Sequence, residues 1–249
     1  MTIRGHRLEI AHIPGDAERP TLVFLHEGLG SAALWKDFPA KVAAATRCPT
    51  LVYSRYGYGR SDPLVGSRAV DYMHDEALES LPDLLDRLGI DRPILIGHSD
   101  GASIALIHAG SGVRPVRGLI LEAPHVFVED LTVDSIAKAK TVYLKTDLAA
   151  KLGRYHDNVD NVFWGWNDIW LHPDFRAWNI EEYLPAITCP ILAIQGADDE
   201  YGTLAQLEAI AAKAKGPVNK LVLPDCCHSP HRDQEQATLD AMAGFIKEL

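Results

Sequence analysis

The chain has 249 residues, 47% of them hydrophobic and 23% charged, a composition typical of a globular protein with one large core. Its formal net charge of −10 disfavours binding to nucleic-acid backbones and anionic membranes, and no cluster of Lys and Arg offsets that charge. No apolar segment is long enough to cross a bilayer, and residues 1–15 lack the apolar centre of a signal peptide. The four cysteines also show no disulfide-framework spacing, so we expect a cytoplasmic protein.

Short apolar runs alternate with amphipathic stretches along most of the chain. Runs that are apolar on both faces are typical of parallel strands covered by helices on both sides. Six such runs predict strands at residues 21–26, 50–54, 93–98, 118–123, 190–196 and 219–224. Helical spacing predicts helices at residues 75–89, 203–216 and 233–249; the first two end in glycine, and Pro82 should kink the first or mark a first turn. The order predicts an α/β fold with a mostly parallel central sheet flanked by helices.

Residues 125–185 interrupt this alternation. They hold four of the five tryptophans and no clear buried strand, so we expect a helical cap inserted into a core domain of residues 1–124 and 186–249. Such an insertion at the carboxyl edge of the sheet is well placed to cover a pocket. The residues expected to contact a small-molecule substrate with an apolar or aromatic part are His125, Trp164, Trp166 and Trp170. Packing in an aromatic subcore is the alternative role of these rings.

The segment Gly97-His98-Ser99-Asp100-Gly101 fits the pattern G-x-S-x-G, with a predicted strand before it and a small-residue helix after it. A serine on a sharp strand-to-helix turn crowds the positions two residues away, where only very small residues fit. We therefore expect Ser99 to be a nucleophile, and the backbone N–H of Asp100 to face a developing oxyanion. A serine hydroxyl also needs a base, and the base needs an orienting carboxylate.

Five segments of the chain resemble the α/β-hydrolase superfamily: "FLHEGLGS", "RYGYGRSD", "GHSDG", "GADD" and "CHSPHRDQ". The resemblance covers nearly the whole length and implies the α/β-hydrolase fold. In that family the base is the first histidine of an H-x-P segment, which matches His228. The family's acid lies three residues past the glycine that closes its strand, which matches Asp199. Asp198 and Glu122 remain alternatives for the acid, and His231 for the base.

The resemblance also implies that the Gly28 amide gives the second oxyanion contact, with Glu27 standing where glycine is usual. A carboxylate within about 4 Å of an oxyanion would cost on the order of 4 kcal/mol. Glu27 is therefore expected to point away and to be held by a partner, or to be a structural turn residue. Glu27 is also counted among the residues expected to contact the substrate. A further hypothesis is that Glu27 and Asp100 form a negative pocket wall that prefers cationic or neutral substrates.

We expect no cofactor and no metal site. His26 and Glu27 begin like the H-E-x-x-H pattern, but residue 30 is glycine. The expected function is hydrolysis of a small carboxylic ester, thioester or lactone through an acyl-enzyme on Ser99. Carbon–carbon bond or amide hydrolysis by the same residues is one alternative, and a ligand receptor with little turnover is another. The oligomeric state stays open.

Overall fold

The computed structural model describes residues 1–249 and contains a seven-stranded sheet with the order β3-β5-β4-β6-β7-β8-β9. Only β3 runs antiparallel to its neighbour; all the other pairs are parallel. This is the α/β-hydrolase arrangement that the sequence predicted. The strands of the sheet are β3 (Glu9–Ile13), β4 (Leu22–Leu25), β5 (Thr50–Ser54), β6 (Ile94–His98), β7 (Gly118–Glu122), β8 (Ile191–Gly196) and β9 (Val218–Leu223).

All six predicted strands are present, and the differences are at the edges of the sheet. Strand β3 was not predicted, nor was the small hairpin of β1 (Thr2–Ile3) and β2 (His6–Arg7). Strand β3 has no fully buried residue because it lies at the edge, so it lacks the continuous apolar run of the inner strands. Strand β9, at the opposite edge, is also largely exposed.

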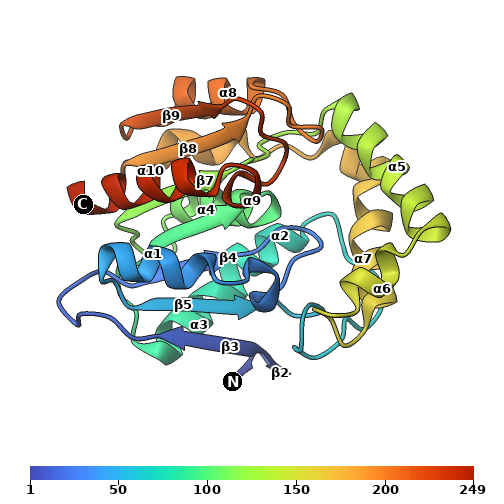
Figure 1. Cartoon of the computed structure of the whole chain (residues 1–249), viewed down its shortest axis with the longest axis horizontal. Coiled ribbons are helices and arrows are strands. Elements are labelled where there is room, and N and C mark those ends of the chain that lie inside the picture. Colours follow the sequence, from blue (N-terminus) through green and yellow to red (C-terminus); the bar gives the residue numbers. More distant parts are fainter.

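Helices cover both faces of the sheet (Figure 1). One face packs against α1 (Phe38–Thr46) and α10 (Glu235–Glu248), and α9 (Pro230–Asp233) precedes α10. The elements that cover the other face are α2 (Tyr72–Asp75), the π-helix η2 (Glu76–Ser80), α3 (Leu81–Leu88), α4 (Asp100–Ser111) and α8 (Ala205–Lys213). A short 3₁₀ helix, η1 (Ala32–Trp35), follows β4.

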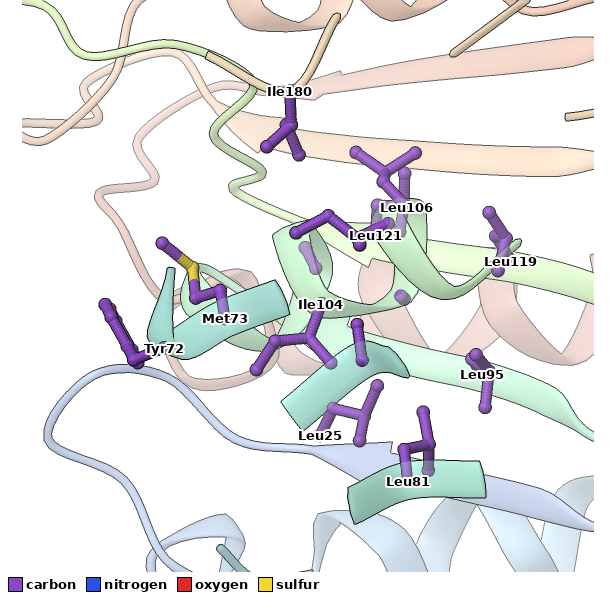
Figure 2. Packing of buried hydrophobic residues seen from close by; sticks show 14 of the residues in the cluster. Leu25, Tyr72, Met73, Leu81, Leu95, Ile104, Leu106, Leu119, Leu121 and Ile180 are labelled. Carbon is purple, nitrogen blue, oxygen red and sulfur yellow. The ribbon is translucent and has the colours of Figure 1, made fainter. Parts of the chain in front are cut away.

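Alternate strand residues divide the core into two clusters. In β4, Leu22 and Phe24 belong to the cluster under α1 and α10, whereas Val23 and Leu25 belong to the larger cluster under α4. In Figure 2, Leu25 and Leu95 from the strands point toward Ile104 of α4 and Leu81 of α3. Burial on both faces holds the inner strands rigidly, and the functional side chains at their carboxyl ends with them.

The segment between β7 and β8 is helical. It contains α5 (Asp130–Lys145), α6 (Leu148–Leu152), α7 (Val159–Trp170), η3 (Pro173–Ala177) and η4 (Glu181–Ala186). Helices α5 to α7 stand together beyond the ends of the strands (Figure 1). The division of the chain into a core domain and a cap domain stays a prediction.

Local details refine the helix predictions. Pro82 lies in the first turn of α3, directly after the π-helix, and Gly89 ends α3 with a left-handed φ of 63°. Gly216 does not terminate α8, which already ends at Lys213. Instead, a Cβ on Gly216 would lie 2.1 Å from the Cys189 carbonyl oxygen, so close backbone packing explains that glycine. No helix is both long and apolar enough to span a membrane.

Candidate active site

Ser99 occupies a strained turn between β6 and α4. Its backbone angles, φ of 53° and ψ of −116°, are values that residues other than glycine rarely adopt. A Cβ on Gly97 would lie 2.3 Å from the Gly101 carbonyl oxygen, and a Cβ on Gly101 would lie 2.0 Å from the Leu25 carbonyl oxygen. Neither position has room for a side chain, which is the physical reason for the two glycines around the serine.

Asp199 and His228 meet after the ends of β8 and β9. The Nδ1–H of His228 donates to Asp199 Oδ1 at 2.8 Å. The same carboxylate accepts the Tyr201 N–H at 2.8 Å and the Gln195 side-chain amide at 3.0 Å. Burial raises the pKa of Asp199, but the charge and hydrogen bond of His228 outweigh it and hold this pKa below its usual value. The carboxylate is thus fixed, ionised and aimed at one ring nitrogen.

The alternative carboxylates lie elsewhere. Glu122, at the end of β7, accepts both the backbone N–H and the Nδ1–H of His231 at 2.9 Å. Glu122, the alternative acid, and His231, the alternative base, therefore pair with each other in the interior and not with His228. Asp198 is exposed, and its side chain makes no hydrogen bond or ion pair. Of the three carboxylates considered, only Asp199 contacts the ring of His228.

Ser99 and His228 line one cavity of about 260 Å³. No hydrogen bond joins the Ser99 hydroxyl to the His228 ring in this structure. The residues around the cavity come from the loop after β4, the turn after β6, the helices after β7 and the loops after β8 and β9; they are Glu27, Gly28, Leu29, Leu34, His98, Ser99, His125, Thr132, Ile136, Leu152, Trp166, Trp170, Glu200, Tyr201, His228, Ser229 and Arg232. Five distant segments of the chain thus meet at the carboxyl end of the sheet.

The loop after β4 fixes the Gly28 amide through the peptide unit that precedes it. The Glu27 carbonyl accepts the Nδ1–H of His26 at 2.7 Å and an Nη2–H of Arg55 at 2.9 Å. In a trans peptide the N–H points opposite to the carbonyl, so these bonds orient the Gly28 N–H, which has no backbone acceptor of its own. A Cβ on Gly28 would lie 2.2 Å from the Trp166 ring, so Trp166 closes the space above this amide.

Asp100 presents its backbone and its carboxylate in different environments. As the first residue of α4, it has no acceptor within the helix for its N–H, which is therefore available to an oxyanion. Its side chain is fully buried, accepts the Tyr72 hydroxyl at 2.7 Å and lies 3.7 Å from Arg55 Nη2. This carboxylate does not line the cavity, so a negative wall of Glu27 and Asp100 together is wrong.

Glu27 does line the cavity, with 22% of its side chain exposed, but it has a cationic partner. Its Oε2 lies 3.5 Å from Nδ1 of His98, the residue before the nucleophile. Burial opposes a charge on either group. The pair outweighs burial in both, keeping the pKa of Glu27 well below its usual range and raising the pKa of His98 to about 9. The expected partner of Glu27 is thus His98.

The predicted substrate residues divide into two groups. His125, Trp166 and Trp170 line the cavity, with the His125 ring 5.7 Å from the His228 ring. Burial lowers the pKa of His125 to about 3, so this ring is neutral near pH 7. Trp164 is not brought to this cavity; its ring packs edge-on against Phe163, with a centroid distance of 5.1 Å, and lines a separate pocket.

Sequence reasoning missed two buried polar partners in the site. The sequence motifs assign no charged partner to His98 or to Arg55, although both side chains are buried and lie near carboxylates. The signal for Arg55 was an arginine directly after the apolar run "TLVYS", where a buried cation requires a carboxylate nearby. That carboxylate is Asp100.

Comparisons with known proteins place the chain in a family. A family model described as "Alpha/beta hydrolase family" matches residues 22–241. The chain is 33% identical to a 2-succinyl-6-hydroxy-2,4-cyclohexadiene-1-carboxylate synthase of Serratia proteamaculans over 112 residues, which span only 43% of this chain and 40% of that one. It is 25% identical to a proline iminopeptidase of Saccharolobus solfataricus, over 92% of this chain and 85% of the relative.

Among solved structures, an enol-lactonase from Burkholderia xenovorans superposes with a TM-score of 0.78. The superposition covers 98% of both chains, at 18% sequence identity. A likeness at that identity concerns the fold alone.

Proposed function

Since this chain belongs to the alpha/beta hydrolase family, we propose that it cleaves a small carboxylic ester, thioester or lactone through an acyl-enzyme on Ser99. One observation carries the proposal: the His228 ring, held by Asp199 at 2.8 Å, lines the same cavity as a serine in the strained conformation of a nucleophile. The enol-lactonase among the similar structures acts on a lactone, by its name.

The proposed reaction has two steps with one set of groups. The Ser99 hydroxyl attacks the substrate carbonyl while His228 Nε2 takes its proton, and Asp199 stabilises the imidazolium that forms. The N–H groups of Gly28 and Asp100 hold the oxyanion of the tetrahedral intermediate. His228 then gives the proton to the departing alcohol, thiol or internal hydroxyl. In the second step His228 activates a water, which releases the acid and restores Ser99.

The cavity wall indicates which substrates fit. Trp166 and Trp170 offer apolar ring faces, and neutral His125 offers a hydrogen bond without a charge. We infer a substrate with an apolar or aromatic part, bound without a cofactor.

Amide hydrolysis is the second candidate, because the proline iminopeptidase relative matches most of the chain. A panel of matched phenylacetyl and acetyl esters, thioesters, lactones and prolyl anilides separates the candidates. We expect ester or lactone turnover by the wild type, a preference for the aromatic acyl group, and loss of turnover in Ser99→Ala. Faster cleavage of the anilides than of the esters would favour the amide reading, and turnover that survives Ser99→Ala contradicts both.

A further inference from the structure

We propose that Glu27 and His98 form a positioning pair that joins the oxyanion loop, the nucleophile turn and the base loop, and that the hydrolysis proposed above requires the protonated form of His98. The inference rests on the proposed function for its kinetic part only. Glu27 and His98 act through their neighbours rather than on the substrate.

The contacts of the two His98 ring nitrogens favour the protonated ring. Its Nε2 lies 2.7 Å from the carbonyl oxygen of His228, which can only accept a hydrogen bond. Its Nδ1 makes no hydrogen bond but lies 3.5 Å from Glu27 Oε2, within ion-pair distance of a carboxylate that favours a positive charge on the ring. A neutral ring would turn a lone pair toward one of these oxygens. The carbonyl contact on Nε2 and the nearby carboxylate on the Nδ1 side together favour the imidazolium form of the ring.

The positions of the two residues in the chain explain what the pair holds. Glu27 directly precedes Gly28, whose N–H is the proposed oxyanion donor, and His98 directly precedes Ser99. The carbonyl bonded by His98 belongs to His228, the proposed base. One buried ring thus connects three loops whose relative placement decides whether attack, proton transfer and oxyanion binding occur together.

The surroundings favour the charged ring. His98 is 1% exposed, and burial alone would make it neutral. Two carboxylates oppose burial: Glu27 from the loop after β4 and Glu122 from the end of β7. The other titratable rings that face His98 are His228 and His231, each with a centroid distance of 5.2 Å; Trp35 of η1 adds an uncharged ring at 6.1 Å.

The pair also explains how a carboxylate is tolerated beside the oxyanion site. The charge of Glu27 is compensated by a cation that is buried behind it, so the cavity does not present an isolated negative charge to the oxyanion. Glycine at position 27 would need no such partner. The Glu27 side chain therefore provides a tether between loops that a glycine at position 27 could not provide.

The test follows His98 itself by an NMR titration of its imidazole between pH 5 and 10.5. In the wild type we expect the ring to titrate near pH 9. In Glu27→Gln, which keeps the size of the side chain and removes its charge, we expect titration below about 6.5, because burial then dominates. Glu27→Asp retains the carboxylate, so His98 should titrate at a higher pH in Glu27→Asp than in Glu27→Gln. If Glu27→Gln folds poorly, the comparison of Glu27→Asp with the wild type takes its place.

Kinetics with the best ester supply the second measurement. We expect kcat/KM of the wild type to fall tenfold per pH unit above about pH 9, and this alkaline limb to move to lower pH in Glu27→Gln together with the His98 titration. The matched control is Glu200→Gln. Glu200 lines the same cavity and accepts the backbone N–H of His228 at 3.2 Å, but it does not contact His98. Its alkaline limb should stay with that of the wild type.

Each outcome decides the proposal. An unchanged His98 titration in Glu27→Gln overturns the pair, and a moved titration with an unmoved alkaline limb overturns its role in catalysis. If the wild type turns over no ester, the proposed function fails separately. The Gly28 amide and His228 ring signals then decide: they must shift in step with the His98 titration, and signals that stay constant overturn the tether.

Discussion

At the scale of single residues, the choice of Asp199 as the orienting acid rests on one 2.8 Å contact. The Asp199→Asn variant cannot stabilise an imidazolium and favours the wrong tautomer of His228. We expect kcat/KM to fall on the order of 10⁴-fold, because an imidazole held in the wrong tautomer cannot accept the serine proton. Steady-state kinetics on the best ester is the measurement.

The neighbouring carboxylate supplies the control. Asp198 is exposed and touches no functional group, so Asp198→Asn should leave kcat/KM within about twofold of the wild type. Equal losses in the two variants would contradict the assignment, as would full activity in Asp199→Asn.

The candidate catalytic residues could be proposed from the sequence because their chain order and local spacing carry the signal. Ser99 is marked by its two glycines, and His228 by the proline two residues later. The partners of Glu27 and Asp100 could not be predicted. Glu27 and His98 are 71 positions apart and Asp100 and Arg55 are 45 apart, and ion pairs across such separations have no periodic signature in one sequence.

At the scale of elements, the nucleophile turn depends on the closeness of α4 to β4. In Gly101→Ala the new Cβ would lie 2.0 Å from the Leu25 carbonyl oxygen, so α4 must move away from the sheet and take Ser99 with it. We expect a loss of more than about 2 kcal/mol in the free energy of unfolding and a kcat/KM reduced at least tenfold. Urea unfolding and ester kinetics measure the two effects.

Gly244 of α10 is the matched control, because nothing lies within 4 Å of a Cβ built there. Gly244→Ala should raise the free energy of unfolding by roughly 0.5–1 kcal/mol, since alanine favours a helix over glycine. A Gly101→Ala variant as stable and active as the wild type would refute the close-approach explanation.

The inner elements were predictable and the edge elements were not, for a physical reason. Strands β4 to β8 are buried on both faces, which requires continuous apolar runs. Strand β3 packs only partly, and its residues Glu9–Ile13 alternate too weakly to be distinguished from a loop. Helix α1 was missed because its polar and apolar faces differ little along "FPAKVAAAT".

At the scale of the whole molecule, the raised pKa of His98 links stability to pH. Because the folded state holds the proton more tightly than the unfolded chain, the stabilisation is fully present below about pH 6.5 and is lost as pH rises through about 9. A shift of that size corresponds to roughly 3 kcal/mol of the free energy of unfolding. Urea unfolding at pH 6, 8 and 10 measures the loss.

Glu27→Gln again isolates the effect, since all other titrating groups remain. We expect the difference in free energy of unfolding between wild type and variant to be largest near pH 7 and to shrink above pH 9. A difference that is constant from pH 6 to 10 would show that Glu27 stabilises the fold by something other than the charge of His98.

The arrangement of the molecule also links the segment between β7 and β8 to the nucleophile turn. Trp170 of α7 donates its indole N–H to the Tyr72 hydroxyl at 3.1 Å, and that hydroxyl donates to Asp100 at 2.7 Å. The helical segment is therefore hydrogen-bonded, through Tyr72, to the first residue of α4, and it also covers the cavity. Its aromatic content was visible in the sequence, but which rings face the cavity depends on helix packing.

The central claim is that Ser99 is an activated nucleophile, and covalent labelling tests it most directly. The measurement is the intact mass of the protein after incubation with a fluorophosphonate, followed by peptide mapping. We predict one phosphonyl adduct per chain on Ser99, and none in Ser99→Ala. A folded wild-type protein that binds small ligands but takes no adduct, or that takes it at another residue, would contradict the account and favour a ligand receptor.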